Sequence, residues 1–89
     1  MITAIETYLA MRRAAGFSLS NTEYLLRSFA SFAINQRQTH IRTATAIQWT
    51  SQARSVAQRH VRYQTVGLLA QYLCVEDSRH ESPPTNYFG

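Results

Sequence analysis

Apolar residues recur at helical spacing along most of the chain, and no segment alternates apolar and polar residues as a strand would. The periodic segments predict helices at residues 2–15, 21–36, 43–53 and 55–75. A chain of 89 residues has room for one small domain. We therefore expect an all-α domain of four helices, or five with a further short one, at residues 1–76. A proline-containing linker or tail should follow at 77–89, because two prolines there oppose further helix.

The expected ends of these helices carry residues that suit them. Thr3 and Ser20 each stand three residues before a glutamate, which is the capping-box pattern at a helix start. Thr43 or Thr45 should cap the third helix. Gly16 follows two arginines and should end the first helix by taking a left-handed conformation. The pattern thus predicts side-chain caps at the starts of three helices.

One apolar stripe of each predicted helix should face a shared core. The residues on these stripes are Ile2, Ile5, Tyr8, Leu9, Leu25, Leu26, Phe29, Phe32, Ala33, Gln36, Ile47, Trp49, Val66, Leu69 and Leu73. The fourth helix carries a second apolar face with Val61, Leu68, Tyr72 and Val75. This second face predicts that the fourth helix lies at the centre of the bundle. Gly67, inside that helix, suggests a close crossing with a neighbouring helix.

Charge is distributed unevenly along the chain. All nine basic residues are arginine, and with five acidic residues they give a formal net charge of +4. From Tyr24 to Val75 there are six arginines and no acidic residue. The arginine fork matches phosphate groups, so a nucleic acid is the expected partner and an anionic membrane a distant second. Base composition alone is the alternative explanation for the arginine bias.

The predicted fourth helix changes character along one stripe. Ser55, Arg59 and Arg62 share a face at its start, and apolar residues continue the same face toward its end. A helix packed along its whole length would keep that stripe apolar, so we expect its first turns to protrude toward an anionic partner. The start of the second helix, at Ser20 to Thr22, also combines backbone N–H groups, hydroxyls and a nearby arginine, which can hold phosphates. A solvated face is the alternative for each arginine.

Residues that could carry other chemistry are few and scattered. His40, His60, His80 and Cys74 lack the close spacing of a zinc site, so we expect no metal and no cofactor. The carboxylates lie at helix starts and in the tail, and no phosphate loop or serine elbow occurs, so we expect neither an enzyme nor a small-molecule substrate. A single cysteine, expected in the core, excludes an internal disulfide and fits a reducing cytoplasm. No apolar run predicts a membrane span, and no export signal is present.

The order of several segments resembles one protein family. The run YLAMRRAAGFSLSNTEYLLRSFASF is similar to the opening of the N-terminal core-binding domain of tyrosine recombinases, the phage and transposon integrases. In that domain a glycine-aromatic turn precedes a helix with hydrophobic residues at fixed distances after its cap, here Leu25, Phe29 and Phe32 after Asn21. TATAIQW, VRYQTVGLLAQYL and the D-x-R-x-E-x-P-P segment resemble its third helix, fourth helix and exit linker. The resemblance covers nearly the whole chain.

The resemblance implies a SAM-like bundle of four or five helices that clamps one face of a recombination half-site, in double-stranded DNA of a bacterial cytoplasm and nucleoid. The second and fourth helices would approach the major groove, and protomers could contact one another on DNA. The family's fourth helix often carries arginine at the positions of Val61 and Gly67, so affinity could be lower here. The residues expected to contact DNA are Ser18, Ser20, Asn21, Arg27, Arg54, Arg59 and Arg62.

The family's catalytic domain would follow the proline linker, and the sequence ends at Gly89. We therefore expect a non-catalytic domain, and Tyr87, which has no arginine and histidine constellation near it in sequence, is not expected to be a nucleophile. A rival hypothesis is a helical interaction module whose apolar face, with Val61, Leu68 and Tyr72, docks another protein or a second copy. A third is a stand-alone regulator that occupies recombination sites without cutting them.

Overall fold

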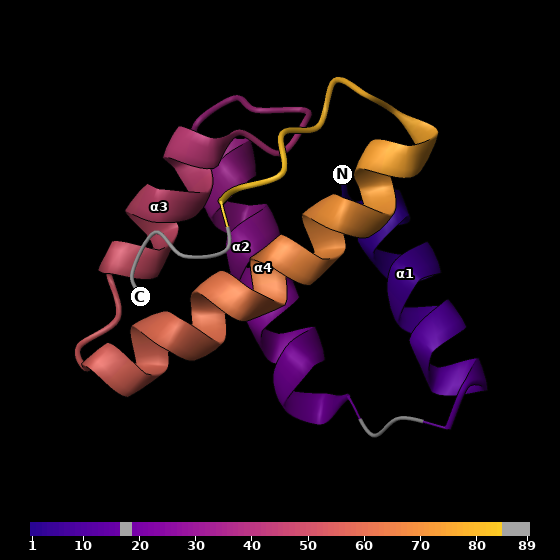
Figure 1. Ribbon diagram of the computed structural model, residues 1–89, viewed down its shortest axis with the longest axis horizontal. Helices are drawn as coiled ribbons and strands as arrows, with labels where there is room; N and C mark the ends of the chain where they lie inside the picture. The colour runs from indigo at the N-terminus through magenta and orange to yellow at the C-terminus, as the bar shows by residue number, and fades with distance from the viewer. Residues whose placement is uncertain (17–18, 85–89) are drawn as a thin grey trace.

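The computed structural model describes residues 1–16 and 19–84, which form four helices (Figure 1). They are α1 (Ile2–Ala14), α2 (Ser20–Asn35), α3 (Thr43–Ser51) and α4 (Val56–Glu76). The described residues contain no strand and no fifth helix, so the all-α prediction is confirmed with four helices. The third helix ends at Ser51, short of the predicted residue 53.

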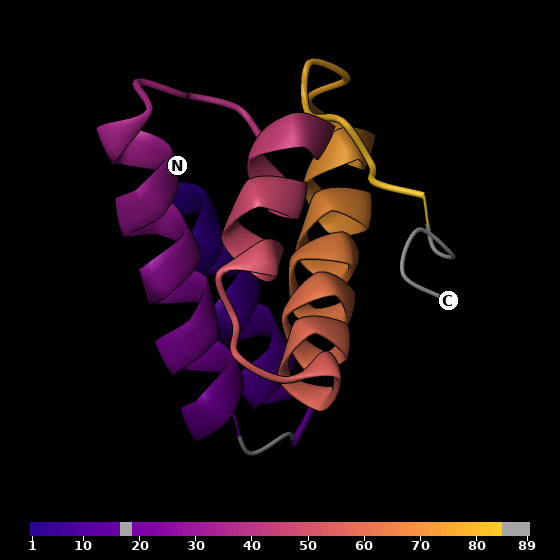
Figure 2. The ribbon, with the colours of Figure 1, turned by 90° about the vertical axis from the view of Figure 1, so that its left-hand side faces the viewer.

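The longest helix, α4, packs against each of the other three, and α2 packs against both α1 and α3. Since α2 also packs against α4, both helices, and not α4 alone, hold the central position that was predicted for α4. α2 and α4 begin at the same end of the bundle, whereas the connection from α2 to α3 and the segment after α4 lie at the opposite end (Figures 1 and 2). Among the described residues, no helix combines the length and the apolar character needed to span a membrane.

Trp49 of α3 is the largest side chain in the core. It is 1% exposed, and its ring meets Phe29 of α2 edge to face at a centroid distance of 5.3 Å. Its indole N–H donates to the Ser28 hydroxyl at 3.2 Å, which satisfies the polar atom that a buried tryptophan brings with it. Trp49 thus lies in the core, as its place on a predicted apolar stripe indicates.

Most of the predicted apolar stripes are buried. The buried members include Ile5, Tyr8, Leu9, Leu25, Leu26, Phe29, Ala33, Val66, Leu69 and Leu73. Ile41 from the connection before α3 and Tyr63 from α4 are also buried, although the helical pattern did not indicate them. Ile2 is exposed and so is Gln36. Both lie near helix ends, where the apolar stripe extends beyond the surface that packs against neighbouring helices.

Among the described residues, the second apolar face of α4 is covered by another helix only at Tyr72, which packs against Tyr8 of α1 with the ring centroids 5.2 Å apart. Val61, Leu68 and Val75 are 42, 50 and 86% exposed, which differs from the prediction of a helix sandwiched on both sides. The close crossing predicted at Gly67 is wrong, because a Cβ atom added there would have no neighbouring atom within 4 Å. Gly16 does take the left-handed conformation predicted for it, with φ of +93°.

The side-chain caps predicted for the first three helices are wrong. The residues that precede these helices are Met1, Leu19 and Arg42, and none makes a side-chain cap bond. The first helical N–H of α3, on Thr43, instead donates to Glu81 Oε1 at 2.7 Å. Ser55 caps α4 by accepting the Gln58 N–H at 3.1 Å, as expected for a serine three residues before a glutamine.

Residues 77–84 lie against the bundle. Glu81 N–H donates to the Ile41 carbonyl at 2.8 Å, and Ile41 N–H donates to His80 Nδ1 at 3.0 Å. Pro83 is buried, and the Tyr63 hydroxyl donates to the Pro84 carbonyl. The predicted domain boundary after residue 76 stays a prediction, but the chain follows the helices at least as far as Pro84. Tyr87, like Phe17 and Ser18, lies outside the described residues.

Candidate nucleic-acid interface

A groove of about 410 Å³ lies between the first turns of α2 and the first turns of α4. Its lining residues are Asn21, Tyr24, Leu25, Ala57, Gln58, Val61 and Arg62. The starts of α2 and α4, predicted as two sites, thus line one groove. Figure 2 shows that both helices begin at the same end of the bundle. Residues far apart in sequence, such as Asn21 and Gln58, share the groove.

The two helix starts differ in how their backbone N–H groups are used. At α4 the Ser55 hydroxyl accepts one of them, the Gln58 N–H. At α2 the preceding residue is Leu19, which offers no side-chain oxygen, and its carbonyl accepts the Glu23 N–H. Among the described residues, no side chain caps the first-turn N–H groups of α2, and such groups favour an anion.

Arg62 lines this groove and is half-buried. Its Nη1 donates to the Trp49 carbonyl at 2.9 Å, and its guanidinium lies over the Trp49 ring at 4.8 Å from the centroid. The last turn of α3 carries no basic residue of its own, so Arg62 supplies a positive charge at the negative end of that helix. The side chain therefore holds α3 to α4.

Arg59 is also half-buried, and its Nε donates to the Ala53 carbonyl in the α3–α4 connection at 3.1 Å. This arrangement differs from the expectation that Arg59 and Arg62 protrude from the bundle. A spacing of three or four residues shows that two side chains share one face of a helix. It does not show whether a long side chain extends into solvent or folds back against the protein. Contact of either arginine with DNA stays a prediction.

The remaining predicted site residues are distributed as follows. Asn21 lines the groove, and Ser20 is exposed at the first turn of α2 beside it. Arg54 is exposed in the connection just before α4. Arg27 is exposed but faces α1, where it pairs with Glu6 at 3.7 Å and with Glu23 of its own helix, so the structure does not bring it into the groove. Ser18 lies outside the described residues.

Five lining residues were not among the predicted contacts: Tyr24, Leu25, Ala57, Gln58 and Val61. Tyr24 is 69% exposed, although its ring is large and apolar. The spacing of Ser55 and Gln58 is a capping-box pattern, so it could have placed Gln58 in the first turn of α4. No sequence signal could have shown that this turn faces Tyr24 across a groove.

A second cluster of polar side chains lies at the opposite end of the bundle. His40 Nε2 is 3.2 Å from Asp77 Oδ2, and the His40 and His80 rings are 4.9 Å apart. Ligand atoms of these three residues lie within 4.8 Å of one another, so the cluster could hold a metal ion by distance alone. His40 and His80 are far apart in sequence, so local spacing could not predict that they lie close together. Cys74, expected in the core, is half-buried nearby, and its thiol donates to the His80 carbonyl at 3.7 Å.

The hydrogen bonds of this cluster use the atoms that a metal would need. His80 Nδ1 accepts the Ile41 N–H, so the neutral ring carries its proton on Nε2 and offers no free lone pair. Arg79 donates to both carboxylate oxygens of Asp77, at 3.0 and 2.8 Å. These bonds from Arg79 hold the pKa of Asp77 well below its usual range. The cluster therefore attaches the segment after α4 to the connection before α3 through hydrogen bonds.

Burial lowers the pKa of His80, and the nearby His40 adds to this effect. The folded state then binds fewer protons than the unfolded state, in which a histidine has a pKa of about 6.5. The full contribution of neutral His80 to the free energy of unfolding is present above that pH. This contribution should decrease as the pH is lowered from about 6.5 toward the lower pKa of the folded state. Protonation would also place a hydrogen on Nδ1, where the Ile41 N–H now donates.

We expect the urea concentration at the midpoint of unfolding to decrease when the pH is lowered from about 7 to about 5. The His80→Asn variant should show a weaker dependence of this midpoint on pH. The asparagine carbonyl oxygen can accept the Ile41 N–H but does not titrate. His60→Asn is the matched control, because His60 is exposed on α4, and it should keep the dependence of the native chain. An unchanged pH profile in His80→Asn would contradict the assignment to His80.

The fold and the groove define a small helical domain with a surface of mixed polar and apolar residues where two helix starts meet. The chain is 33% identical over 84 residues to the "Putative integrase/recombinase y4rB" of Sinorhizobium fredii (strain NBRC 101917 / NGR234). This similarity supports a relationship between the chain and the integrases. The match covers 92% of this chain and 27% of that protein, so the chain spans about a quarter of its relative's length. No protein-family model and no solved structure matches the chain.

Proposed function

We propose that this chain is a DNA-binding domain of a site-specific tyrosine recombinase or integrase, of the SAM-like core-binding type, that clamps a recombination half-site. The observation that carries the proposal is the groove that joins the starts of α2 and α4. The similarity to an integrase/recombinase supports it, since such a protein acts on DNA. The proposed setting is a bacterial cytoplasm, where the domain binds the nucleoid and neighbouring protomers could meet on the DNA.

The chemistry of this end of the bundle suits a polyanion. First-turn N–H groups of α2 and the exposed guanidinium of Arg54 can hold phosphates on either side of the groove. Asn21, Tyr24 and Gln58 can donate hydrogen bonds from within it. No acidic side chain lines the groove among the described residues. Phosphate contacts would position the domain, and the groove side chains would face the bases.

In this proposal the domain itself does not catalyse strand exchange. We assign catalysis to the larger part of an integrase that lies outside the region matched here, which covers 27% of the relative. The domain would contribute affinity and placement on the half-site.

A charge introduced into the groove tests the proposal. Gln58→Glu should weaken binding to duplex DNA by about tenfold, since a carboxylate in the groove repels phosphates. The substitution should keep or raise stability, because glutamate in the first turn of a helix completes the capping box with Ser55 and favours the helix dipole. Loss of binding would therefore not reflect loss of folding. Fluorescence anisotropy with a labelled duplex measures affinity, and thermal unfolding measures stability.

Gln71→Glu is the matched control for this experiment. It makes the same charge change on the same helix, at an exposed position outside the groove. We expect its affinity to stay within about twofold of the native chain, because an exposed charge beyond a Debye length of about 10 Å is largely screened. Equal losses in both variants would show that net charge, and not the groove, governs binding.

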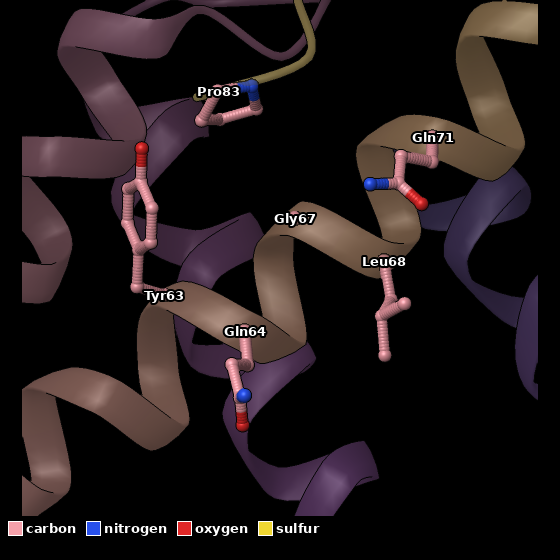
Figure 3. Close-up of a pocket in the computed structure, with 6 residues that line it drawn as sticks. All are labelled: Tyr63, Gln64, Gly67, Leu68, Gln71 and Pro83. Atoms are coloured by element: carbon pink, nitrogen blue, oxygen red, sulfur yellow. The ribbon is translucent and has the colours of Figure 1, made fainter. Parts of the chain in front are cut away.

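A second candidate function is a protein interaction module, and the exposed apolar face of α4 favours it. Leu68 borders a cavity of about 300 Å³ that is also lined by Tyr63, Gln64, Gly67, Gln71 and Pro83 (Figure 3). Figure 3 shows Tyr63 directed toward Pro83, whereas Leu68 and Gln64 point to the other side of the helix. Leu68→Ser should abolish docking of an apolar partner and leave DNA affinity unchanged. A loss of DNA affinity in Leu68→Ser would instead place this face of α4 on the DNA.

A further inference from the structure

Four of the seven residues that line the groove belong to two chemical types. Asn21 and Gln58 carry amides, and Ala57 and Val61 present methyl groups. These residues come from the first two turns of α4 and the first turn of α2, so they lie where a helix start would enter a major groove. Val61 is 42% exposed, so its methyl groups are available for contact.

Each of these types has a matching base edge in the major groove. An amide offers a donor and an acceptor side by side, which fits N7 and N6 of adenine. Methyl groups of alanine and valine pack against the C5-methyl group of thymine. Amides and methyl groups placed together in one groove therefore match both bases of an A·T pair at its major-groove edge.

The side chains that read the other base pair are missing from the groove or already engaged. Guanine is read most often by arginine, and the arginine in this groove, Arg62, donates to the Trp49 carbonyl and stacks on the Trp49 ring. Arg59 donates to the Ala53 carbonyl. Cytosine is read by carboxylates, and the groove lining contains none among the described residues.

Turning Arg62 toward a guanine would break its bond to α3 and uncover Trp49, which is 1% exposed. The buried carbonyl of Trp49 would then lose the guanidinium donor. The fold itself thus opposes guanine recognition by this arginine and leaves the amides and methyl groups to face the bases.

We propose that the groove between α2 and α4 reads A·T base pairs in the major groove, with Gln58 and Asn21 on adenine and Val61 and Ala57 on the thymine methyl group. This inference rests on the proposed function, since it assumes that the groove faces DNA. It adds the class of base pair that the half-site should contain opposite the two helix starts.

The test compares the native chain on two duplexes of equal length, one rich in A·T pairs and one rich in G·C pairs, by anisotropy at about 100 mM salt. We expect about tenfold tighter binding to the A·T-rich duplex, the discrimination typical of one bidentate base contact. Two modified A·T duplexes test which groove is read. Deoxyuridine in place of thymidine removes the C5-methyl group, and 7-deazaadenine removes the N7 acceptor, so each should reduce the preference.

Gln58→Ala should lower the preference for A·T pairs and keep most of the binding that does not depend on sequence. Gln71→Ala, outside the groove on the same helix, should keep the full preference. The arms with modified bases leave the protein unchanged, so they remain decisive if a variant fails to fold.

Equal binding to both duplexes would overturn A·T reading and leave DNA binding by this surface intact. A preference that survives both base modifications would also overturn it, because the shape of a narrow minor groove would then explain the result. Absence of binding to every duplex at low salt would overturn the proposed function itself. The failure of this inference and the failure of the proposed function thus give different results.

Discussion

Replacing Trp49 with alanine should lower the free energy of unfolding by about 3–5 kcal/mol, the range measured for large aromatic residues in a core. The side chain is 1% exposed, and its removal would leave a cavity beside Phe29. It would also strip the Ser28 hydroxyl of a donor and leave Arg62 without the ring on which it lies. Small domains have about 5–15 kcal/mol of stability in total, so this variant should be close to unfolding.

Urea unfolding followed by circular dichroism measures the effect of Trp49→Ala, and Tyr24→Ala is its control. Tyr24 is also a large aromatic residue, but it is 69% exposed, so its loss should change stability by no more than about 0.5 kcal/mol. Similar losses in the two variants would show that Trp49 does not hold the core together. Trp49→Phe should fall between them, because it keeps most of the packing but loses the indole donor to Ser28.

The position of Trp49 links the core to the groove. Its ring contacts α2 through Phe29, its carbonyl receives Arg62 of α4, and it belongs to α3. One residue therefore contributes to the relative placement of three helices, α2, α3 and α4. Damage to this core should reduce DNA affinity indirectly, so affinity measurements on Trp49 or Arg62 variants require a parallel measurement of folding. Gln58 avoids this difficulty because its side chain is exposed.

Helix positions could be predicted from sequence because the apolar period is a property of each segment alone. The stripe with Leu25 and Phe29 on α2 and the stripe with Val66 and Leu69 on α4 are buried as predicted. Caps could not be predicted so well. The start of α3 is bound by Glu81, which is 38 residues away from Thr43, and a local pattern contains no information about such a partner.

The candidate site was predictable to a similar degree. The two helix starts were indicated by hydroxyl and charge patterns, and Asn21 lies in the groove. The direction of the arginine side chains was not predictable, since the partner of Arg62 is a backbone carbonyl 13 residues away. The pattern of charged residues along α4 is the same whether the arginine side chains extend into solvent or fold back against the protein. The amide and methyl groups became candidates only when the fold placed α2 beside α4.

Raising the salt concentration from about 50 to about 200 mM should weaken binding to duplex DNA by about 10²–10³-fold, if the surface makes about 4–6 phosphate contacts. The physical reason is that each neutralised phosphate releases counterions, and added salt opposes this release. Anisotropy titrations at several salt concentrations give the slope. Docking of an apolar partner on the Leu68 face of α4 should barely respond to the same change, because hydrophobic burial does not depend on released counterions.

A matched pair of arginine variants locates the phosphate contacts within this salt dependence. Arg54→Gln, beside the groove, should reduce the slope of log affinity against log salt by about one, the value for one lost phosphate contact. Arg37→Gln removes the same charge from an exposed residue just after the last turn of α2, away from the first turn that lines the groove, and should leave the slope unchanged. A slope reduced by Arg37→Gln and not by Arg54→Gln would move the DNA to the other end of the bundle. A slope near zero in the native chain would leave the apolar face of α4 as the better candidate for a binding surface.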